Sequence, residues 1–231
     1  MNDRDFVGQH PGILVPIIVT ELDRITRLPS PVTISAFLPD ALPTTIPLNP
    51  SIHLDLEAAA QALGTLSGLG ALLANPYLLI RPFLRREAVA SSRIEGTVVD
   101  LQDLVLYEED EKSAAPAGDV REVANYVRAL EYGLRRPEDR GISSTLIREL
   151  HAQLMRDVRG GDRNPGKYRQ GQVIIGQPGM RARDARFVPP PAHEVPMLIN
   201  DLQRAIEAES DLPKLIRVAL IHYQFETIHP F

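Results

Sequence analysis

The spacing of apolar residues predicts a chain that is helical over most of its length after residue 50. Between Ile52 and Leu73 the apolar positions recur every three or four residues, and Asn75 followed by Pro76 ends the segment. The same spacing, together with capping residues and prolines or glycines at the boundaries, predicts further helices at 82–95, 100–107, 119–136, 145–158, 191–209 and 213–228.

Local sequence signals predict where several of these helices start. Pro82 suits the first helical position, where a missing N–H costs nothing. Asp119 and Glu122 have the spacing of a capping box, and Ser143 or Ser144 is expected to cap the helix that follows.

Two stretches depart from the helical pattern. The first fifty residues are rich in proline, which resists helix interiors, and they are expected to form an extended arm with a short helix at 20–26. Later, the β-branched stretch 172–175, a turn at 177–179 and a returning segment at Phe187-Val188 predict a β-hairpin. The predicted fold class is therefore mainly α: a helical core with one β-hairpin flap, preceded by a small helical N-terminal domain with a proline-rich arm.

The segment 213–228 carries apolar residues nearly all round the predicted helix. A helix with no broad polar face is usually buried at the centre of a domain. Because chain ends ordinarily lie at surfaces, we expect further residues to follow Phe231.

Composition narrows the class of protein. The chain has no cysteine, which excludes disulfides and thiolate chemistry and favours a reducing, cytoplasmic compartment. Its net charge of -5, with no tryptophan, gives no basis for nucleic-acid binding. The apolar stretch 13–19 is short and contains Pro16, so neither a signal sequence nor a membrane span is expected.

Three segments, SSRIEG at 91–96, NPGKYR at 164–169 and FETIHPF at 225–231, together and in this order resemble motifs of the Fic family of nucleotidyltransferases. Residues 91–96, SSRIEG, are similar to the family's inhibitory helix. Residues 164–169, NPGKYR, lead into VIIG at 173–176 and are similar to its flap hairpin. Residues 225–231, FETIHPF, resemble the opening of its active-site motif, which continues in the family as x-[Asp/Glu]-Gly-Asn-Gly-Arg-x-x-Arg. Each motif is modest alone, but their order and spacing are specific.

The resemblance implies an N-terminal Fic-associated domain at 1–86 and a Fic core at 87–231. It also implies a bacterial protein adenylyltransferase that uses ATP and Mg²⁺ to transfer AMP to a Ser, Thr or Tyr hydroxyl of a target protein. His229 would take the proton from that hydroxyl, a role that suits a group titrating near neutral pH. Pro230 and Phe231 would anchor the motif, with Phe231 packed beneath His229.

Two further sets of residues acquire roles from the resemblance. Ser91, Glu95 and Gly96 would form the inhibitory segment, in which Glu95 holds an arginine that otherwise binds the ATP γ-phosphate. The flap residues are Val173, Ile174, Ile175 and Gly176. An exposed flap edge can bind an extended target segment by strand addition.

Structural alternatives stay open for each of these residues. His229 would otherwise be a core histidine, Glu95 a solvated carboxylate at a helix end, and the flap a hairpin that covers the core. His222, Glu226 and His229 have spacing that can hold a metal, but three ligands on one helix converge poorly. No metal ligand is assigned in this chain, because the resemblance places the Mg²⁺ carboxylate, the phosphate loop and the arginines after Phe231.

Two functional alternatives also stay open. One alternative is a truncated, inactive Fic protein that serves as an interaction or oligomerisation module. The chain is equally compatible with a Fic enzyme of altered chemistry, which removes AMP or transfers another phosphate-containing group. The 231 residues alone are expected to be inactive, because they contain a base and no phosphate site. The target, the nucleotide preference and any homo-oligomer are left open.

Overall fold

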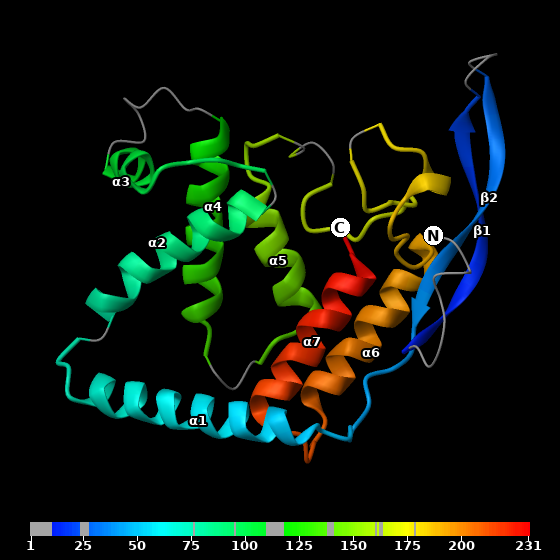
Figure 1. The fold of residues 1–231 in the computed structure, drawn as a ribbon. Helices are drawn as coiled ribbons and strands as arrows, with labels where there is room; N and C mark the ends of the chain where they lie inside the picture. Colours follow the sequence, from blue (N-terminus) through cyan, green and yellow to red (C-terminus); the bar gives the residue numbers. More distant parts are fainter. Residues whose placement is uncertain are drawn as a thin grey trace. The chain divides into compact units, whose positions relative to one another are not determined.

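The computed structural model describes residues 11–23, 28–75, 77–94, 96–109, 118–137, 141–159, 161, 164–177 and 179–231. These residues form helices α1 to α7 and one two-stranded antiparallel sheet, so the prediction of a mainly α fold with a hairpin is confirmed (Figure 1). The chain packs as two compact units, residues 1–46 with 168–231 and residues 47–167. The domain boundary at 86/87 divides the chain differently and stays a prediction.

The hairpin lies where the proline-rich arm was predicted. Strand β1 (Gly12–Leu22) pairs antiparallel with β2 (Pro29–Pro39) along their whole length, from Gly12 opposite Pro39 to Leu22 opposite Pro29. Thr20 belongs to β1, so the short helix predicted at 20–26 is wrong over the described residues. The segment forms strands because its apolar residues alternate along the chain. Successive side chains of a strand point to opposite faces, so one face of both strands can be buried.

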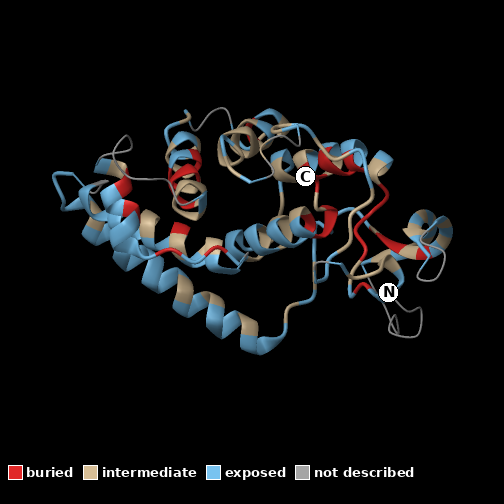
Figure 2. Ribbon diagram, turned by 90° about the horizontal axis from the view of Figure 1, so that it is seen from above, coloured by how far each residue is buried: buried red, intermediate tan, exposed pale blue. Residues whose placement is uncertain are grey.

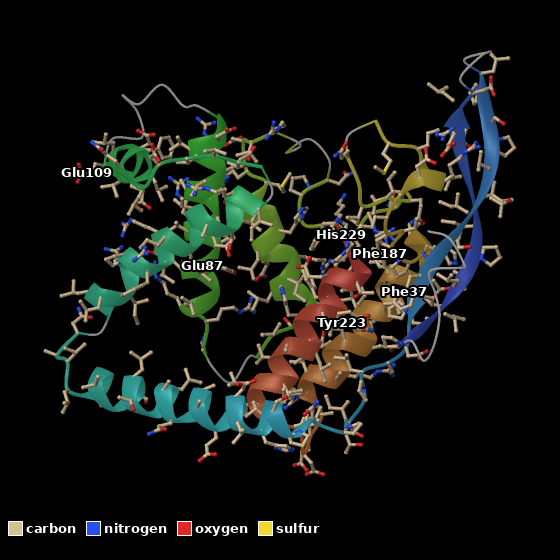
Figure 3. All side chains as sticks on the ribbon, in the orientation of Figure 1. Phe37, Glu87, Glu109, Phe187, Tyr223 and His229 are labelled. Carbon is tan, nitrogen blue, oxygen red and sulfur yellow. The ribbon has the colours of Figure 1, made fainter. Side chains whose placement is uncertain are left out.

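The inner face of the hairpin packs on the segment around residues 174–188. Ile34 and Ala36 of β2 form a buried cluster with Ala185 and Val188, and the inner residues of β1 cover it. The Phe37 N–H donates to the Val188 carbonyl at 2.9 Å. Val188 therefore lies beside the edge of β2 that does not pair with β1. The rings of Phe37 and Phe187, labelled in Figure 3, lie 6.0 Å apart.

The predicted hairpin at 172–188 is much reduced in the structure. A single antiparallel bridge joins Ile175 to Phe187, through a 2.9 Å bond from the Ile175 N–H to the Phe187 carbonyl. Between them the short 3-10 helix η3 (Ala182–Asp184) turns the chain away from a regular ladder. Over the described residues, the strand pair is therefore β1 with β2, and the flap is a loop held by one bridge.

Helices α6 (Val195–Glu207) and α7 (Lys214–Ile228) complete this unit, with the 3-10 helix η4 (Ala192–Glu194) leading into α6. One apolar side of α6 is buried against Ile228 of α7. The prediction that α7 is buried on all sides is wrong here: only Gln224, Thr227 and Ile228 are buried, and Val218 is 63% exposed. The helix packs on α6 and β2 along one side, so its other apolar residues face outward.

The second unit contains α1 (Pro50–Ala71), α2 (Tyr77–Ile94), α3 (Leu101–Glu109), α4 (Gly118–Leu134) and α5 (Ser144–Leu154). Its core lies among α2, α3 and α4 and is formed by Ala88, Val99, Leu104, Tyr107, Val123, Ala124 and Val127. All residues of α1 are described and none of them is buried (Figure 2).

Helix boundaries differ from the predictions at two places. Pro82 lies inside α2 rather than at its first position, so the helix starts earlier than predicted and lacks one backbone donor in its second turn. The capping box at Asp119 is also wrong, because Asp119 lies within α4 and Glu122 accepts a 2.8 Å bond from the Thr97 hydroxyl. The Ser143 cap is confirmed, since its hydroxyl accepts from the Leu146 N–H. Among the described residues, no helix is long and apolar enough to cross a membrane.

Candidate functional site

The candidate site begins where α7 ends. His229 is the C-cap of the helix, with its N–H donating to the Phe225 carbonyl at 3.0 Å. The Pro230 that follows excludes a further helical turn, as the sequence predicted. His229 has a left-handed backbone with φ 47° and ψ 67°, a conformation that costs a non-glycine residue of order 1–3 kcal/mol and persists only where surrounding contacts enforce it.

Arg169 supplies such contacts. Its Nε donates to the His229 carbonyl at 2.7 Å, and an Nη donates to the Ile228 carbonyl at 3.2 Å. The Arg169 backbone N–H also donates to the Pro230 carbonyl at 2.9 Å. Three consecutive carbonyls, at the end of α7 and just beyond it, are thus bound by one residue.

The same guanidinium reaches the base of the flap. Its Nη atoms donate to the carbonyls of Gly171 at 3.2 Å and Pro190 at 2.7 Å, which flank the flap on its two sides. Among the described residues, each hydrogen bond of this side chain goes to a backbone carbonyl. Burial lowers the pKa of Arg169 to about 10, so the group stays charged at neutral pH.

Aromatic packing holds the last residue of the site. The rings of Tyr168 and Phe231 lie 5.5 Å apart, tilted by 41°. Tyr168 in turn packs against the α6–α7 cluster, and Pro230 between His229 and Phe231 is buried. Phe231 therefore packs on Tyr168, the neighbour of Arg169.

Two polar side chains of α7 are buried and hydrogen-bonded. Gln224 donates from its amide to the Asp40 carbonyl just after β2 at 3.0 Å. Thr227 donates to the Tyr223 carbonyl one turn earlier at 2.7 Å. Both bonds satisfy groups that would otherwise be costly to bury, and the Gln224 bond joins α7 to the segment after β2.

The predicted flap residues lie in this same unit. The Gln172 amide donates to the Val173 carbonyl at 3.0 Å and to the Pro189 carbonyl at 2.9 Å. Ile174 packs against the hairpin cluster, whereas Ile175 is 38% exposed. A Cβ at Gly176 would lie 2.6 Å from the Met180 sulfur, so this position favours glycine. A groove of ≈ 650 Å³ lies between the end of β1 and the flap.

The predicted inhibitory segment lies in the other compact unit. The Ser91 hydroxyl donates to Glu87 at 2.8 Å, one turn earlier on α2. Glu95 lies outside the described residues. Gly96 has φ 89°, and its N–H donates to the Arg93 carbonyl at 3.1 Å. A left-handed glycine after the helix is an ordinary helix stop, as the sequence predicted, while the Glu87 contact was missed.

A histidine that the sequence analysis passed over holds the turn before the flap. The Nδ1 of His151, on α5, accepts a 3.0 Å bond from the Gly166 N–H. Burial lowers the pKa of His151, which favours the neutral form able to accept this bond. Nothing in the spacing of residues 151 and 166 predicts the contact, because it depends on how α5 meets the turn.

The structure does not support a metal site formed by His222, Glu226 and His229. His222 and Glu226 are exposed, and His229 lies beyond the helix with a left-handed backbone. Across the described parts of the chain, no three His, Asp or Glu side chains are grouped so that they would hold a metal ion.

Two protein-family models match two successive stretches of the chain. A protein-family model described as Fic/DOC family N-terminal matches residues 53–135, and one described as Fic/DOC family matches residues 141–231. A probable protein adenylyltransferase of Aquifex aeolicus (strain VF5) is 26% identical over 158 residues, which cover 67% of this chain and 46% of that protein.

Solved structures agree with this result. The crystal structure of a Fic family protein from Desulfovibrio desulfuricans G20 matches with a TM-score of 0.61 at 25% identity. The match covers 80% of this chain and 54% of that one. The chain thus spans about half the length of both relatives.

Proposed function

The chain belongs to the Fic/DOC family, and from this premise we propose that it carries the base and the target-binding flap of a protein adenylyltransferase. The enzyme would transfer AMP from ATP to a Ser, Thr or Tyr hydroxyl of a target protein. The observation that supports this most is the position of Arg169, whose bonds join the His229 backbone to both sides of the flap.

In the proposed reaction, the His229 imidazole accepts the proton of the target hydroxyl. The hydroxyl oxygen bonds to the α-phosphorus of ATP while the bond from that phosphorus to the bridging oxygen of the β-phosphate breaks, releasing pyrophosphate. The flap, with Ile175 exposed beside its single bridge, would hold the target segment in an extended form. A left-handed residue at the end of α7 directs the chain away from the helix axis at the reacting position.

Mg²⁺ would stabilise the phosphate charges in such a reaction. The described residues contain no group of three acidic or histidine side chains that fits the ion, so no step is assigned to it here. We propose that the ligands of Mg²⁺ and of the ATP phosphates come from the part of the family motif that follows residues 225–231. The 231 residues alone are then expected to bind a target without transferring AMP.

We also propose that Glu95 inhibits the enzyme by holding an arginine of that later motif. The sequence supports this, because Ser91, Glu95 and Gly96 match the spacing of the family's inhibitory motif, and Gly96 has the left-handed backbone common just after a helix. A cytoplasmic location and a protein target, rather than nucleic acid or membrane, are parts of the same proposal. They are supported by the absence of cysteine and by the net charge of -5.

The test uses the protein expressed from its complete coding sequence, incubated with ATP labelled at the α-phosphate and Mg²⁺. Label should enter protein, and His229→Ala should abolish it. Label from the γ-phosphate should not be incorporated. Loss of AMP from a modified protein, without its addition, would instead favour the alternative chemistry, and no nucleotide-dependent reaction at all would favour an interaction module.

A further inference from the structure

We propose that Arg169 is a positioning residue for the transfer reaction, which fixes the backbone of His229 and couples it to the flap. The inference rests on the proposed function of His229 as base. Arg169 itself would touch neither the hydroxyl nor the phosphate; its guanidinium binds the carbonyls of Ile228, His229, Pro190 and Gly171.

Arg169 binds the carbonyl end of α7. The last carbonyls of a helix have no partner within the helix and must be satisfied by side chains, water or other groups. Here the Ile228 and His229 carbonyls are bound by adjacent nitrogens of one planar group, which constrains both peptide planes at once. These two peptide planes lie on either side of the His229 Cα. They therefore set the position and direction of the Cα–Cβ bond from which the imidazole projects.

Arg169 also binds both ends of the flap. A base acts on a hydroxyl only when the two are held within hydrogen-bond reach, and the target would be held by the flap, not by α7. The bonds from Arg169 to the Gly171 and Pro190 carbonyls join the flap ends to the same group that binds the base. The distance between base and target is therefore set through this side chain.

A point charge cannot replace this arrangement. The bonds leave from Nε and from both Nη atoms of Arg169 and reach carbonyls on three separate segments. A lysine would bring a charge but not the fixed fork of donors. Positioning thus predicts that Lys at residue 169 fails to replace Arg, whereas a general electrostatic role predicts that it succeeds.

The chain contains a matched control in Arg217. Its Nη donates to the carbonyls of Ala205 at 3.0 Å, Ile206 at 2.6 Å and Ala208 at 2.7 Å, at the end of α6. It is the same chemistry, one guanidinium capping the carbonyl end of a helix, placed near the start of α7 and away from His229. Loss of Arg217 should lower the stability of the protein without changing the position of His229.

The kinetic test compares Arg169→Met, Arg169→Lys and Arg217→Met in the protein from the complete coding sequence. For Arg169→Met we expect a fall in kcat of about 100-fold with a KM for ATP within about threefold of the parent, because small misplacements of a reacting group have effects of this size. Arg169→Lys should stay within about threefold of Arg169→Met, and Arg217→Met should keep the parental kcat. Parental kcat in Arg169→Met, full recovery by lysine, or an equal loss in Arg217→Met would each overturn the proposal.

A spectroscopic test needs no activity and separates this inference from the proposed function. In the 231-residue chain, the ¹³Cα shift of His229 reports its backbone conformation, and Arg169→Met should move it toward the extended value while Arg217→Met leaves it unchanged. In the unmodified chain the Arg169 Nε–H should be protected from solvent exchange, which remains measurable if Arg169→Met does not fold. An unmoved His229 shift or an unprotected Nε–H would overturn the positioning role even if AMP transfer is established. A moved shift in a protein without transferase activity would instead refute the proposed function alone.

Discussion

The Nε of Arg169 donates a 2.7 Å hydrogen bond to the carbonyl of His229, sixty residues later in the chain. The bond joins the NPGKYR segment to the end of α7, two of the segments that resemble family motifs. Their resemblance therefore has a direct structural meaning, since one motif holds the backbone of the other.

The first prediction concerns the energy of this contact. Arg169→Met should lower the free energy of unfolding by about 1.5–3 kcal/mol, because part-buried hydrogen bonds from a charged group to backbone carbonyls are lost. Arg204→Met is the control: Arg204 is a surface cation, 78% exposed and paired with Asp201, and should cost less than about 1 kcal/mol. Urea unfolding of both variants measures the difference. Equal effects would mean that the Arg169 bonds add nothing beyond a surface ion pair.

The second prediction concerns pH. Because burial lowers the folded-state pKa of His151 below its ordinary 6.5, the unfolded chain binds the proton more readily. The contribution of His151 to stability is therefore complete above pH 6.5 and declines as the pH falls toward the folded pKa. Protonation of Nδ1 also removes the acceptor for the Gly166 N–H.

Unfolding free energies measured between pH 5 and 8 test this, with His151→Asn as the matched variant. The asparagine carbonyl can accept from Gly166 but does not titrate. Below pH 6.5, the unfolding free energy of the parent is expected to fall relative to that of His151→Asn. Parallel curves for the two proteins would show that His151 is not the responsible group.

The third prediction concerns the turn that His151 holds. Gly166 has φ 76°, and a Cβ there would lie 2.9 Å from the Arg148 carbonyl, so Gly166→Ala combines backbone strain with a close contact. A loss of about 1–3 kcal/mol is expected for a residue forced into such a conformation. Gly171→Ala is the control, since a Cβ there meets nothing within 4 Å. Thermal unfolding should separate the two; similar melting temperatures would contradict the turn geometry described above.

The sequence predicted those parts of the fold that depend on nearby residues. The helices at α1, α5, α6 and α7 follow from apolar spacing and from local caps such as Ser143, which act within a few residues. The position of residue 229 outside the helix follows from Pro230 alone.

What could not be predicted depends on contacts between distant segments. Prolines obscured the strand pattern of β1 and β2, whose pairing is decided by the fit of Ile17 with Ile34 and their neighbours. The burial of α7 was overestimated, because composition gives the apolar residues but not which of them meet α6. The contacts of Arg169 with His229, and of His151 with Gly166, carry no periodic signal at all.

The fourth prediction concerns Glu95 in the protein from the complete coding sequence. If Glu95 holds an arginine that otherwise binds the γ-phosphate, Glu95→Gly should increase self-labelling with AMP. A charge-assisted pair of this kind contributes about 1.5–3 kcal/mol, so its release would raise productive ATP binding by about one to two orders of magnitude. The added glycine should have little effect on folding, because Gly96 already ends the helix.

Glu87 provides the matched control for this last experiment, since it is a carboxylate on α2 and accepts a hydrogen bond from the Ser91 hydroxyl. Glu87→Gln should leave labelling at the parental level, while Glu95→Gln should raise it in the direction of Glu95→Gly. Adding His229→Ala to Glu95→Gly should remove the gain, because the base is then absent. If Glu87→Gln activates as strongly as Glu95→Gln, the effect comes from the general charge or stability of α2. If neither activates and both proteins melt at the parental temperature, Glu95 is a solvated carboxylate at a helix end and does not inhibit.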